Sequence, residues 1–220
     1  MGSSRPESEP SAGGGRTRRG LLGAAALLAL GRPALATLEP SDAALVARIE
    51  AWLQGITTLR ARFTQLAPDG RMATGTVFLH RPGRLRFDYD PPSKLLLIAT
   101  DWRLVLVDSA ARQVNVLPLA QTPLAFLLDE QVRLGGEIEV RSVQRRAGEI
   151  ALEIVRAKEP DQGRVVLVFG EAPLELRRWA VTDPQGLTTT VLLEEPEYGV
   201  TLDPALFRFH DPNVFGWPEG

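Results

Sequence analysis

The spacing of apolar residues changes near position 60, and this change divides the chain into a helical part and a β-rich part. Between residues 41 and 59, leucine, isoleucine and tryptophan recur every three or four positions, which predicts an amphipathic helix with one buried face. Ser41 is suited to cap this helix, with Asp42 in its first turn. We expect the helix to include Ile56 and Leu59.

Short β-rich segments separated by turn residues fill most of the remaining chain. The turns are rich in Pro, Gly, Asp and Ser and are brief, so consecutive strands are expected to pair antiparallel as a meander. In one of these strands Leu85, Phe87 and Tyr89 point to one side, while arginine and aspartate side chains point to the other. Strands are expected at residues 62–66, 74–80, 84–90, 95–100, 104–108, 113–117, 134–143, 149–156, 164–169, 174–181 and 187–193.

A second helical signal interrupts the strands at residues 122–128. Thr122 is suited to cap a helix and Pro123 to occupy its first position, ahead of five apolar residues. A segment this apolar must be covered on more than one face. One last helical turn is expected at residues 203–206. About eleven strands and two helices predict a fold that is mainly β with some α, built on one strongly curved sheet.

Residues 1–36 have the pattern of an export signal. A pair of arginines precedes a mild apolar run, residues 21–30, and residues 34–36 offer a small-x-small cleavage site. Ten apolar residues are too few to span a bilayer as a helix, which needs about 20. The paired arginines favour twin-arginine export over the general secretory route, and both routes lead to the bacterial periplasm. We therefore expect one mature domain, residues 37–220.

Composition narrows the classes of function. The leader contains five arginines and two glutamates, so residues 37–220 carry 20 basic and 25 acidic side chains, a net charge near −5. That sign gives no electrostatic reason to bind nucleic acid or anionic lipid surfaces. The chain has no cysteine, which excludes disulfides and thiol chemistry and leaves no N-terminal cysteine to carry a lipid. We therefore expect a protein without a membrane tether.

The side chains that build catalytic or metal sites are scarce. The two histidines, His80 and His210, have no second histidine or cysteine nearby, whereas a zinc site needs three or four such ligands. No Gly-x-Ser-x-Gly elbow, phosphate-binding loop or dinucleotide motif occurs after residue 36. Asp88 and Asp90 share one strand face, and a solvated outer face balanced by neighbouring arginines explains them better than a catalytic pair. His80 is expected at the surface end of a strand. Neither an enzyme nor a cofactor is predicted.

A set of short motifs follows in order along residues 61–128. They are Ala61-Arg62-Phe63-Thr64-Gln65, Asp69-Gly70, Gly75, Arg81-Pro82-Gly83, Arg86-Phe87-Asp88-Tyr89, Asp108 and Thr122-Pro123-Leu124-Ala125-Phe126-Leu127-Leu128. With this order and spacing the chain resembles the outer-membrane lipoprotein carrier proteins, the LolA family, over roughly residues 40–215. The resemblance implies an incomplete, open antiparallel β-barrel of about eleven strands, whose apolar interior is covered by a helical lid.

The resemblance also implies a function. A carrier of this family is expected to take triacylated lipoproteins from an inner-membrane ABC transporter, cross the periplasm and hand the cargo to an outer-membrane acceptor. In the family, the arginine of the Arg-Pro turn holds the lid closed through hydrogen bonds to lid carbonyls, and by position that residue is Arg81. We expect a monomer. Two features depart from the family pattern: Asp101-Trp102 stands where an Asp-Gly turn is usual, and the tail after Phe215 is short.

A cavity for acyl chains needs apolar walls that are loosely packed and a cover that moves. The candidate wall residues are Phe63, Leu85, Phe87, Tyr89, Leu97, Phe126, Leu127 and Trp179. For each of them the alternative is ordinary packing of a barrel interior. For Arg81 the alternative is a surface charge whose replacement changes stability by no more than about 0.5 kcal/mol.

Three other functions stay open at this point. The first is a periplasmic module of the same fold that senses a lipid or lipoprotein, because one fold hosts several functions. The second is a membrane-anchored acceptor, against which the missing cysteine argues. The third is a hydrolase, against which the missing site chemistry argues.

Overall fold

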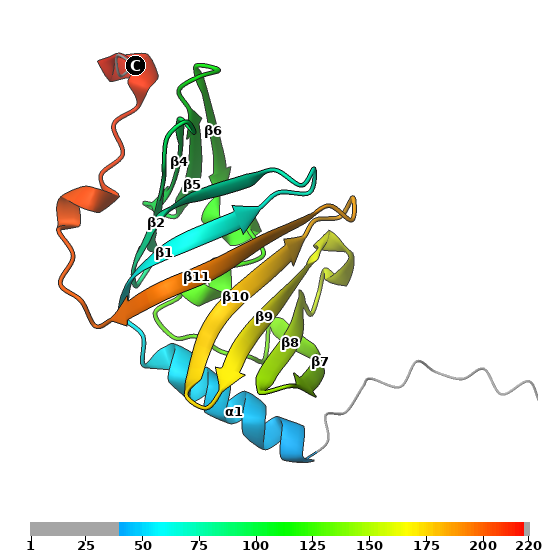
Figure 1. Ribbon diagram of the computed structural model, residues 1–220. Coiled ribbons are helices and arrows are strands. Elements are labelled where there is room, and N and C mark those ends of the chain that lie inside the picture. Colours follow the sequence, from blue (N-terminus) through cyan, green and yellow to red (C-terminus); the bar gives the residue numbers. More distant parts are fainter. Residues whose placement is uncertain (1–39, 218–220) are drawn as a thin grey trace, which may run out of the picture. The chain divides into compact units, whose positions relative to one another are not determined.

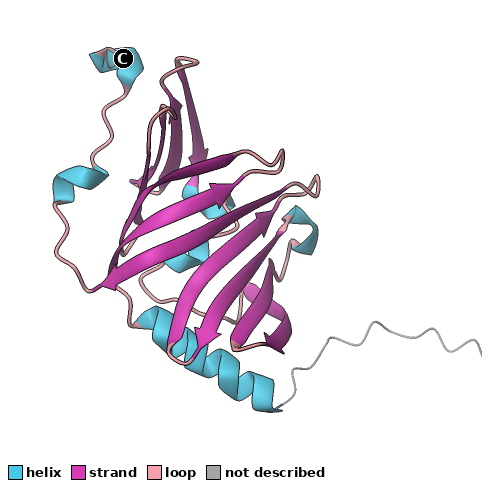
Figure 2. Cartoon of the chain, in the orientation of Figure 1, coloured by secondary structure: helices cyan, strands magenta, loops and turns pink. Residues whose placement is uncertain are grey.

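One antiparallel sheet of eleven strands dominates the computed structural model, which describes residues 40–217 (Figures 1 and 2). The leader predicted at residues 1–36 lies outside the described residues. The strands are β1 (Thr58–Leu66), β2 (Met72–His80), β3 (Arg84–Tyr89), β4 (Leu95–Thr100), β5 (Arg103–Asp108), β6 (Gln113–Pro118), β7 (Ile138–Arg146), β8 (Glu149–Arg156), β9 (Arg164–Glu171), β10 (Leu174–Thr182) and β11 (Thr188–Tyr198). The helices are α1 (Pro40–Gln54), α2 (Pro212–Phe215) and four 3₁₀ helices, η1 (Leu119–Gln121), η2 (Ala125–Leu128), η3 (Pro160–Gln162) and η4 (Pro204–Phe207).

The order of the strands shows how the chain builds an open barrel. Across the sheet they run β6-β5-β4-β3-β2-β1-β11-β10-β9-β8-β7, and every neighbouring pair is antiparallel. The chain therefore starts in the middle at β1, moves outward to the edge strand β6, crosses to the opposite edge at β7 and returns to pair β11 with β1. Because β6 and β7 do not pair, the barrel is not closed. The predicted open, mainly β fold is confirmed.

The main hydrophobic core lies where the inner face of this sheet meets α1 and the crossover between the edge strands. Strand alternation supplies the inner residues: Phe63, Val77 and Phe87 are buried, with their sequence neighbours turned outward. Gly75 belongs to the same packing. A Cβ atom at this position would lie 2.1 Å from the carbonyl oxygen of Asp88 and 2.6 Å from the Phe63 ring, so only glycine allows β2 and β3 to approach this closely.

Helix α1 is shorter than its sequence pattern predicts. It begins at Pro40, so Ser41 lies in its first turn, and it ends at Gln54. The predicted extension to Leu59 is wrong, because Leu59 is already part of β1 and pairs with β11. Gly55 follows the helix directly, and the β-branched residues after it favour a strand. Leu59 is still buried in the main core, which explains why it fitted the helical pattern.

Part of the outer face is covered rather than solvated. Ile98, Val105 and Val107 point away from the main core and form a second buried cluster, against which Phe209 and Trp217 of the C-terminal segment pack. His80 ends β2 as expected. It is half-buried, however, with its ring 5.9 Å from that of Phe207, so the prediction of a surface position is wrong.

The acidic pair on β3 is balanced in part by a more distant arginine. Arg86 pairs with Asp88 at 2.7 Å, as the sequence predicts for this face. Asp90 instead pairs with Arg62 of β1 and accepts a hydrogen bond of 2.7 Å from the Thr74 hydroxyl, and these contacts lower the pKa of its carboxyl. The partner of Asp90 comes from two strands away, which local sequence does not show.

Candidate functional site

Residues 119–128, here called the lid segment, form the first half of the crossover between the edge strands. The helix predicted at 122–128 is confirmed only over residues 125–128 and as a 3₁₀ helix, since the segment consists of η1, a break at the three residues 122–124, and η2. Thr122 ends η1 instead of starting a helix, with both its N–H and its hydroxyl bonded to the carbonyl oxygen of Leu119. Pro123 explains the break, because a residue before proline is held extended, and Thr122 has φ −86° and ψ 140°.

Beneath η2 lies a small apolar cavity of about 60 Å³. Its walls come from the end of α1, from β1, β2 and β3, from β10 and β11, and from η2. The lining residues are Trp52, Leu53, Ile56, Leu59, Val77, Leu79, Arg81, Leu85, Leu124, Leu127, Leu128, Leu176, Trp179, Leu193 and Tyr198. This volume holds about four water-sized groups, far fewer than the carbons of a fatty acyl chain. The cavity therefore marks where apolar space exists beneath η2, without offering room for a whole chain.

Arg81 spans the seam between α1 and the lid segment. Its Nε donates to the carbonyl oxygen of Leu127 at 2.6 Å, and its Nη1 donates to the carbonyl oxygens of Ile56, at 2.7 Å, and Leu53. The accepting carbonyls lie in the last turn of α1 (Leu53), in the loop just after it (Ile56) and in the last turn of η2 (Leu127), where helix ends leave acceptors for a charged donor. Burial lowers the pKa of Arg81 to about 10, and the charge of Asp129 opposes that shift, so the guanidinium stays charged at neutral pH.

Main-chain bonds hold both ends of the lid segment as well. At its end, the N–H of Gly83 donates to the carbonyl oxygen of Leu128 at 2.8 Å, directly beside the Arg81 contact. At its start, the N–H of Leu119 donates to the carbonyl oxygen of Trp102 at 2.8 Å. The Arg81-Pro82-Gly83 turn thus fixes η2, whereas the turn between β4 and β5 fixes η1.

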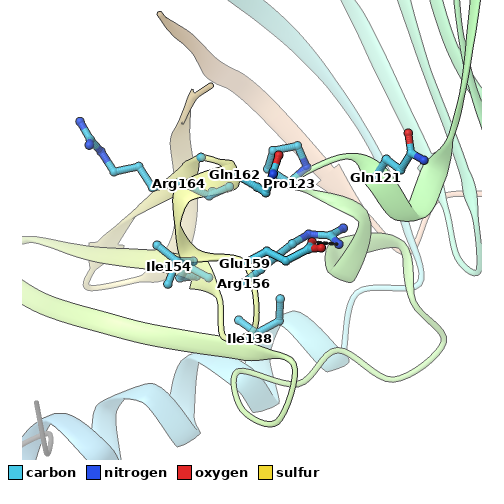
Figure 3. Close-up of a pocket in the computed structure, with 11 residues that line it drawn as sticks. Gln121, Pro123, Ile138, Ile154, Arg156, Glu159, Gln162 and Arg164 are labelled. Carbon is cyan, nitrogen blue, oxygen red and sulfur yellow. Dashed lines mark ion pairs between the residues drawn. The ribbon is translucent and has the colours of Figure 1, made fainter. Parts of the chain in front are cut away.

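A second arginine holds the lid segment from the opposite half of the sheet. Arg156, at the end of β8, donates to the carbonyl oxygens of Ala120 and Thr122, and its guanidinium lies 3.7 Å from the Glu159 carboxylate (Figure 3). Arg156 and Glu159 border a cavity of about 350 Å³ at the end of β8 and the start of β9. Arg156 was not predicted from the sequence, because nothing local distinguishes it from other strand-end arginines. Its role depends on where the crossover passes.

The second half of the crossover, residues 129–137, is fastened to α1. The Gln54 side chain accepts from the N–H of Val132 at 2.7 Å and donates to the carbonyl oxygen of Glu130 at 3.2 Å, and Glu50 accepts from the N–H of Leu134. Because of these contacts α1 and the crossover form one cover over the inner face of the sheet.

The predicted wall residues all lie in or against the main core, but only some border the cavity. Leu85, Leu127 and Trp179 line it, together with Arg81. The rings of Phe63, Phe87 and Tyr89 pack on one another, with centroids 4.9 Å apart for the first two and 5.2 Å for Phe63 and Tyr89. None of these three rings is among the residues that line the cavity.

The two remaining predicted wall residues, Leu97 and Phe126, do not line the cavity, and several residues that do line it were not predicted. Leu97 packs against the core from β4, and Phe126 is buried in the core and borders the groove on the other side of η2 rather than the cavity. The sequence-based prediction included Trp179 of β10 but missed the contributions of α1 and β11 to the cavity. The inward alternation of Leu59, Val77 and Leu79 was a usable signal, because it places them on the same face as Phe63.

Tyr198 brings a polar atom into these apolar surroundings. Its ring lies 5.5 Å from that of Trp52, edge to face, and its hydroxyl is buried with no hydrogen-bond partner among the described residues. Burial, aided by the charge of Glu175, raises the pKa of this phenol, so it stays neutral. A neutral hydroxyl in this position interrupts the apolar wall without charging it.

Titratable groups are scarce in the cavity. Of the described residues that line it, only Arg81 and Tyr198 titrate, and Arg81 is engaged with carbonyl oxygens. Across residues 40–217, no three His, Cys, Asp or Glu side chains come together in a way that would hold a metal ion. Within the same range, no helix combines the length and apolar character needed to cross a bilayer.

Most of the chain is similar to one family of known proteins. The family described as "Outer membrane lipoprotein carrier protein LolA" matches residues 54–210. The chain belongs to the LolA family. Its relatives include proteins named outer-membrane lipoprotein carrier protein from Methylococcus capsulatus, 29% identical over 75% of this chain and 83% of that protein, and from Azotobacter vinelandii, 30% identical over 78% and 86%. A protein of the same name from Nitrosomonas europaea is 26% identical over 79% and 88%. LolA membership confirms the resemblance seen in the sequence motifs.

Proposed function

We propose that this protein carries acylated lipoproteins across the periplasm, from an inner-membrane ABC transporter to an outer-membrane acceptor. The observation that carries the proposal is an apolar cavity closed by a single 3₁₀ turn, η2, whose last carbonyls are held by Arg81 and Gly83. Membership of the LolA family and the names of the relatives support the same role. The export leader at residues 1–36 belongs to this proposal, since it would deliver the carrier to the periplasm.

The energetics of such a carrier require a cavity that opens. Burying an acyl chain gains about 0.8 kcal/mol per CH₂, on the order of 10 kcal/mol for a chain of ordinary length. Withdrawing the chain from a bilayer costs a similar amount, so the carrier has to match the membrane and still release its load. A cavity that closes to about 60 Å³ favours release of the cargo, because the lid segment recovers its own contacts once the chain has left.

We assign to Arg81 the role of holding η2 closed until cargo enters and after it leaves. An entering acyl chain must move η2 away from the sheet and break the bond between Arg81 and Leu127. When the cargo leaves, that bond and the one from Gly83 to Leu128 form again. The wall residues assigned to the acyl chains are Leu85, Leu127 and Trp179, with Phe63, Phe87, Tyr89, Leu97 and Phe126 behind them or at the rim.

Transfer of cargo between two membranes tests the proposal. The protein is loaded with a triacylated lipoprotein released from inner-membrane vesicles, and delivery to outer-membrane vesicles is followed by centrifugation and immunoblotting. We expect delivery of the acylated cargo and no complex with the same lipoprotein after deacylation. Equal binding of the two forms would refute carriage by the acyl chains, and binding without delivery would favour the sensing function.

A further inference from the structure

A second, larger hollow lies on the other side of η2. It is an open groove of about 620 Å³ between the lid segment, the loop 129–137 and the end of β8. Helix η2 separates the two spaces. Ala125 and Phe126 line the groove, whereas Leu127 and Leu128 line the closed cavity. One turn of 3₁₀ helix is therefore the wall between an apolar pocket and an accessible surface groove.

The lining of the groove differs from that of the cavity. It contains three acidic side chains, three basic side chains, two glycines and the ring of Trp102 among a few apolar residues. The charged residues of the groove are Asp129, Glu137, Glu159, Arg133, Arg156 and Lys158. Hydrocarbon gains little from such a surface, because burying unpaired charges is costly. An extended polypeptide offers both amide hydrogen bonds and side chains that suit it.

Trp102 is the most unusual residue of this surface. It is 64% exposed although it is a large aromatic, and it follows Asp101 in a turn where both residues have positive φ, 48° and 60°. Its ring stands about 4 Å from where a Cβ atom of Gly83 would lie, beside the turn that holds η2. This exposed ring at the edge of the groove offers a flat contact to a partner chain.

We propose that this groove binds the polypeptide segment that directly follows the acylated residue of the cargo. The inference rests on the proposed carrier function and adds the part of the cargo that stays outside the cavity. If acyl chains occupy the space beneath η2, the peptide attached to them emerges at η2, and the adjoining groove is the surface that it meets. The balance of three acidic and three basic groups favours no sign of charge, so the groove accepts peptides of different sequence.

Two ligands and two groove variants test this inference. The ligands are a triacylated cysteine with a blocked carboxyl group and the same lipid extended by a neutral peptide of about six residues, roughly 20 Å when stretched. The variants are Trp102→Ala and Gly135→Leu. A side chain at Gly135 meets no atom within 4 Å and the backbone there has no positive φ, so leucine narrows the groove without strain. The matched controls are Phe215→Ala and Ala111→Leu, both at exposed positions outside the groove lining.

We expect the wild-type protein to bind the peptide-bearing ligand about tenfold more tightly than the bare lipid, as measured by calorimetry. Both groove variants should lose this advantage and bind the bare lipid as the wild type does, and the controls should keep it. Peptides carrying two positive or two negative charges should bind within about twofold of each other at low salt, since the groove charges balance.

Several results would overturn the inference. It fails if the wild type binds both ligands equally, or if the groove variants weaken both ligands to the same extent, because that pattern reports a disturbed lid. It also fails if the sign of the peptide charge decides affinity. Absence of binding for either ligand refutes the carrier function itself, which distinguishes that failure from failure of the groove.

Discussion

Replacing Arg81 with leucine is the most direct test of how the lid segment is held. Of the hydrogen bonds that the guanidinium makes, the one to Leu127 reaches η2, while those to Leu53 and Ile56 stay on the α1 side of the seam. A hydrogen bond from a charged group contributes about 1.5–3 kcal/mol. Its loss raises the ratio of open to closed lid by about 10- to 150-fold. The bond from Gly83 to Leu128 remains, so closure is weakened and not abolished.

The expected consequence is a carrier that loads but does not release. Weaker closure lowers the free energy of the loaded form relative to the empty one by the same amount, and the leucine side chain adds apolar surface to the cavity wall. We therefore expect Arg81→Leu to fold, to take up acylated cargo and to deliver it about 10- to 150-fold more slowly. Delivery is measured with the two-membrane transfer assay.

Lid position needs its own measurement. Because the chain has no cysteine, a single fluorophore attached at Glu130→Cys, next to η2, reports opening through accessibility to a quencher. The matched control is Arg84→Leu, two residues past Pro82, whose guanidinium lies 5.8 Å from the ring of Phe207 on the outer face. Wild-type rates of delivery together with wild-type quenching in Arg81→Leu would refute the latch.

Three further predictions follow from the same contacts. Arg156→Gln should speed amide hydrogen exchange in the lid segment and leave β1 and β2 protected, because it removes the hydrogen bonds that join β8 to the residues around η1. Unchanged exchange in the lid segment would show that Arg156 does not hold it. Burial, with the nearby charge of an arginine, lowers the pKa of His80, so the unfolded chain binds a proton at a higher pH than the folded chain does. The free energy of unfolding should therefore fall as the pH drops below about 6.5, by at most about 1.4 kcal/mol per pH unit. In urea titrations, the free energy of unfolding of His80→Gln should depend less on pH than that of the wild type. Tyr198→Phe removes a buried hydroxyl without a partner, so the free energy of unfolding should stay level or rise by up to about 1 kcal/mol, and a loss of 1 kcal/mol or more would show that the hydroxyl is bonded in solution.

The strands were largely predictable because each one carries its own evidence. In β3, for example, alternation alone placed Phe87 inside and Asp88 outside, and short turns implied antiparallel neighbours. β11 shows the limit of such evidence. It continues to Tyr198, five residues past the predicted end, through a charged stretch in which Glu195 has positive φ and Pro196 interrupts the ladder. An irregular strand of this kind is specified by its partner β1 and not by its own pattern.

The candidate site was less predictable for a related reason. Its residues come from strand ends, from α1 and from a crossover that is distant in sequence, and nothing local to Arg156 or Trp52 indicates what they will meet. The helix predicted at the lid segment is shorter in the structure, because Pro123 keeps Thr122 extended and the 3₁₀ turn starts only at Ala125. Arg81 was found only through the resemblance to a family, since a single arginine in a turn carries no signal of its own.

The path of the chain also determines which connection limits how far the two halves of the sheet separate. β1 and β11 join the halves in the middle, so the distant margins β6 and β7 are tethered to each other only through residues 119–137 within the part of the chain described here. One backbone cleavage at the exposed Gly135-Gly136 would leave every pair of strands bonded. The cleaved protein would therefore keep its fold but lose the direct covalent connection between its two edge strands. The length of residues 119–137 thus sets the largest distance by which β6 and β7 can separate.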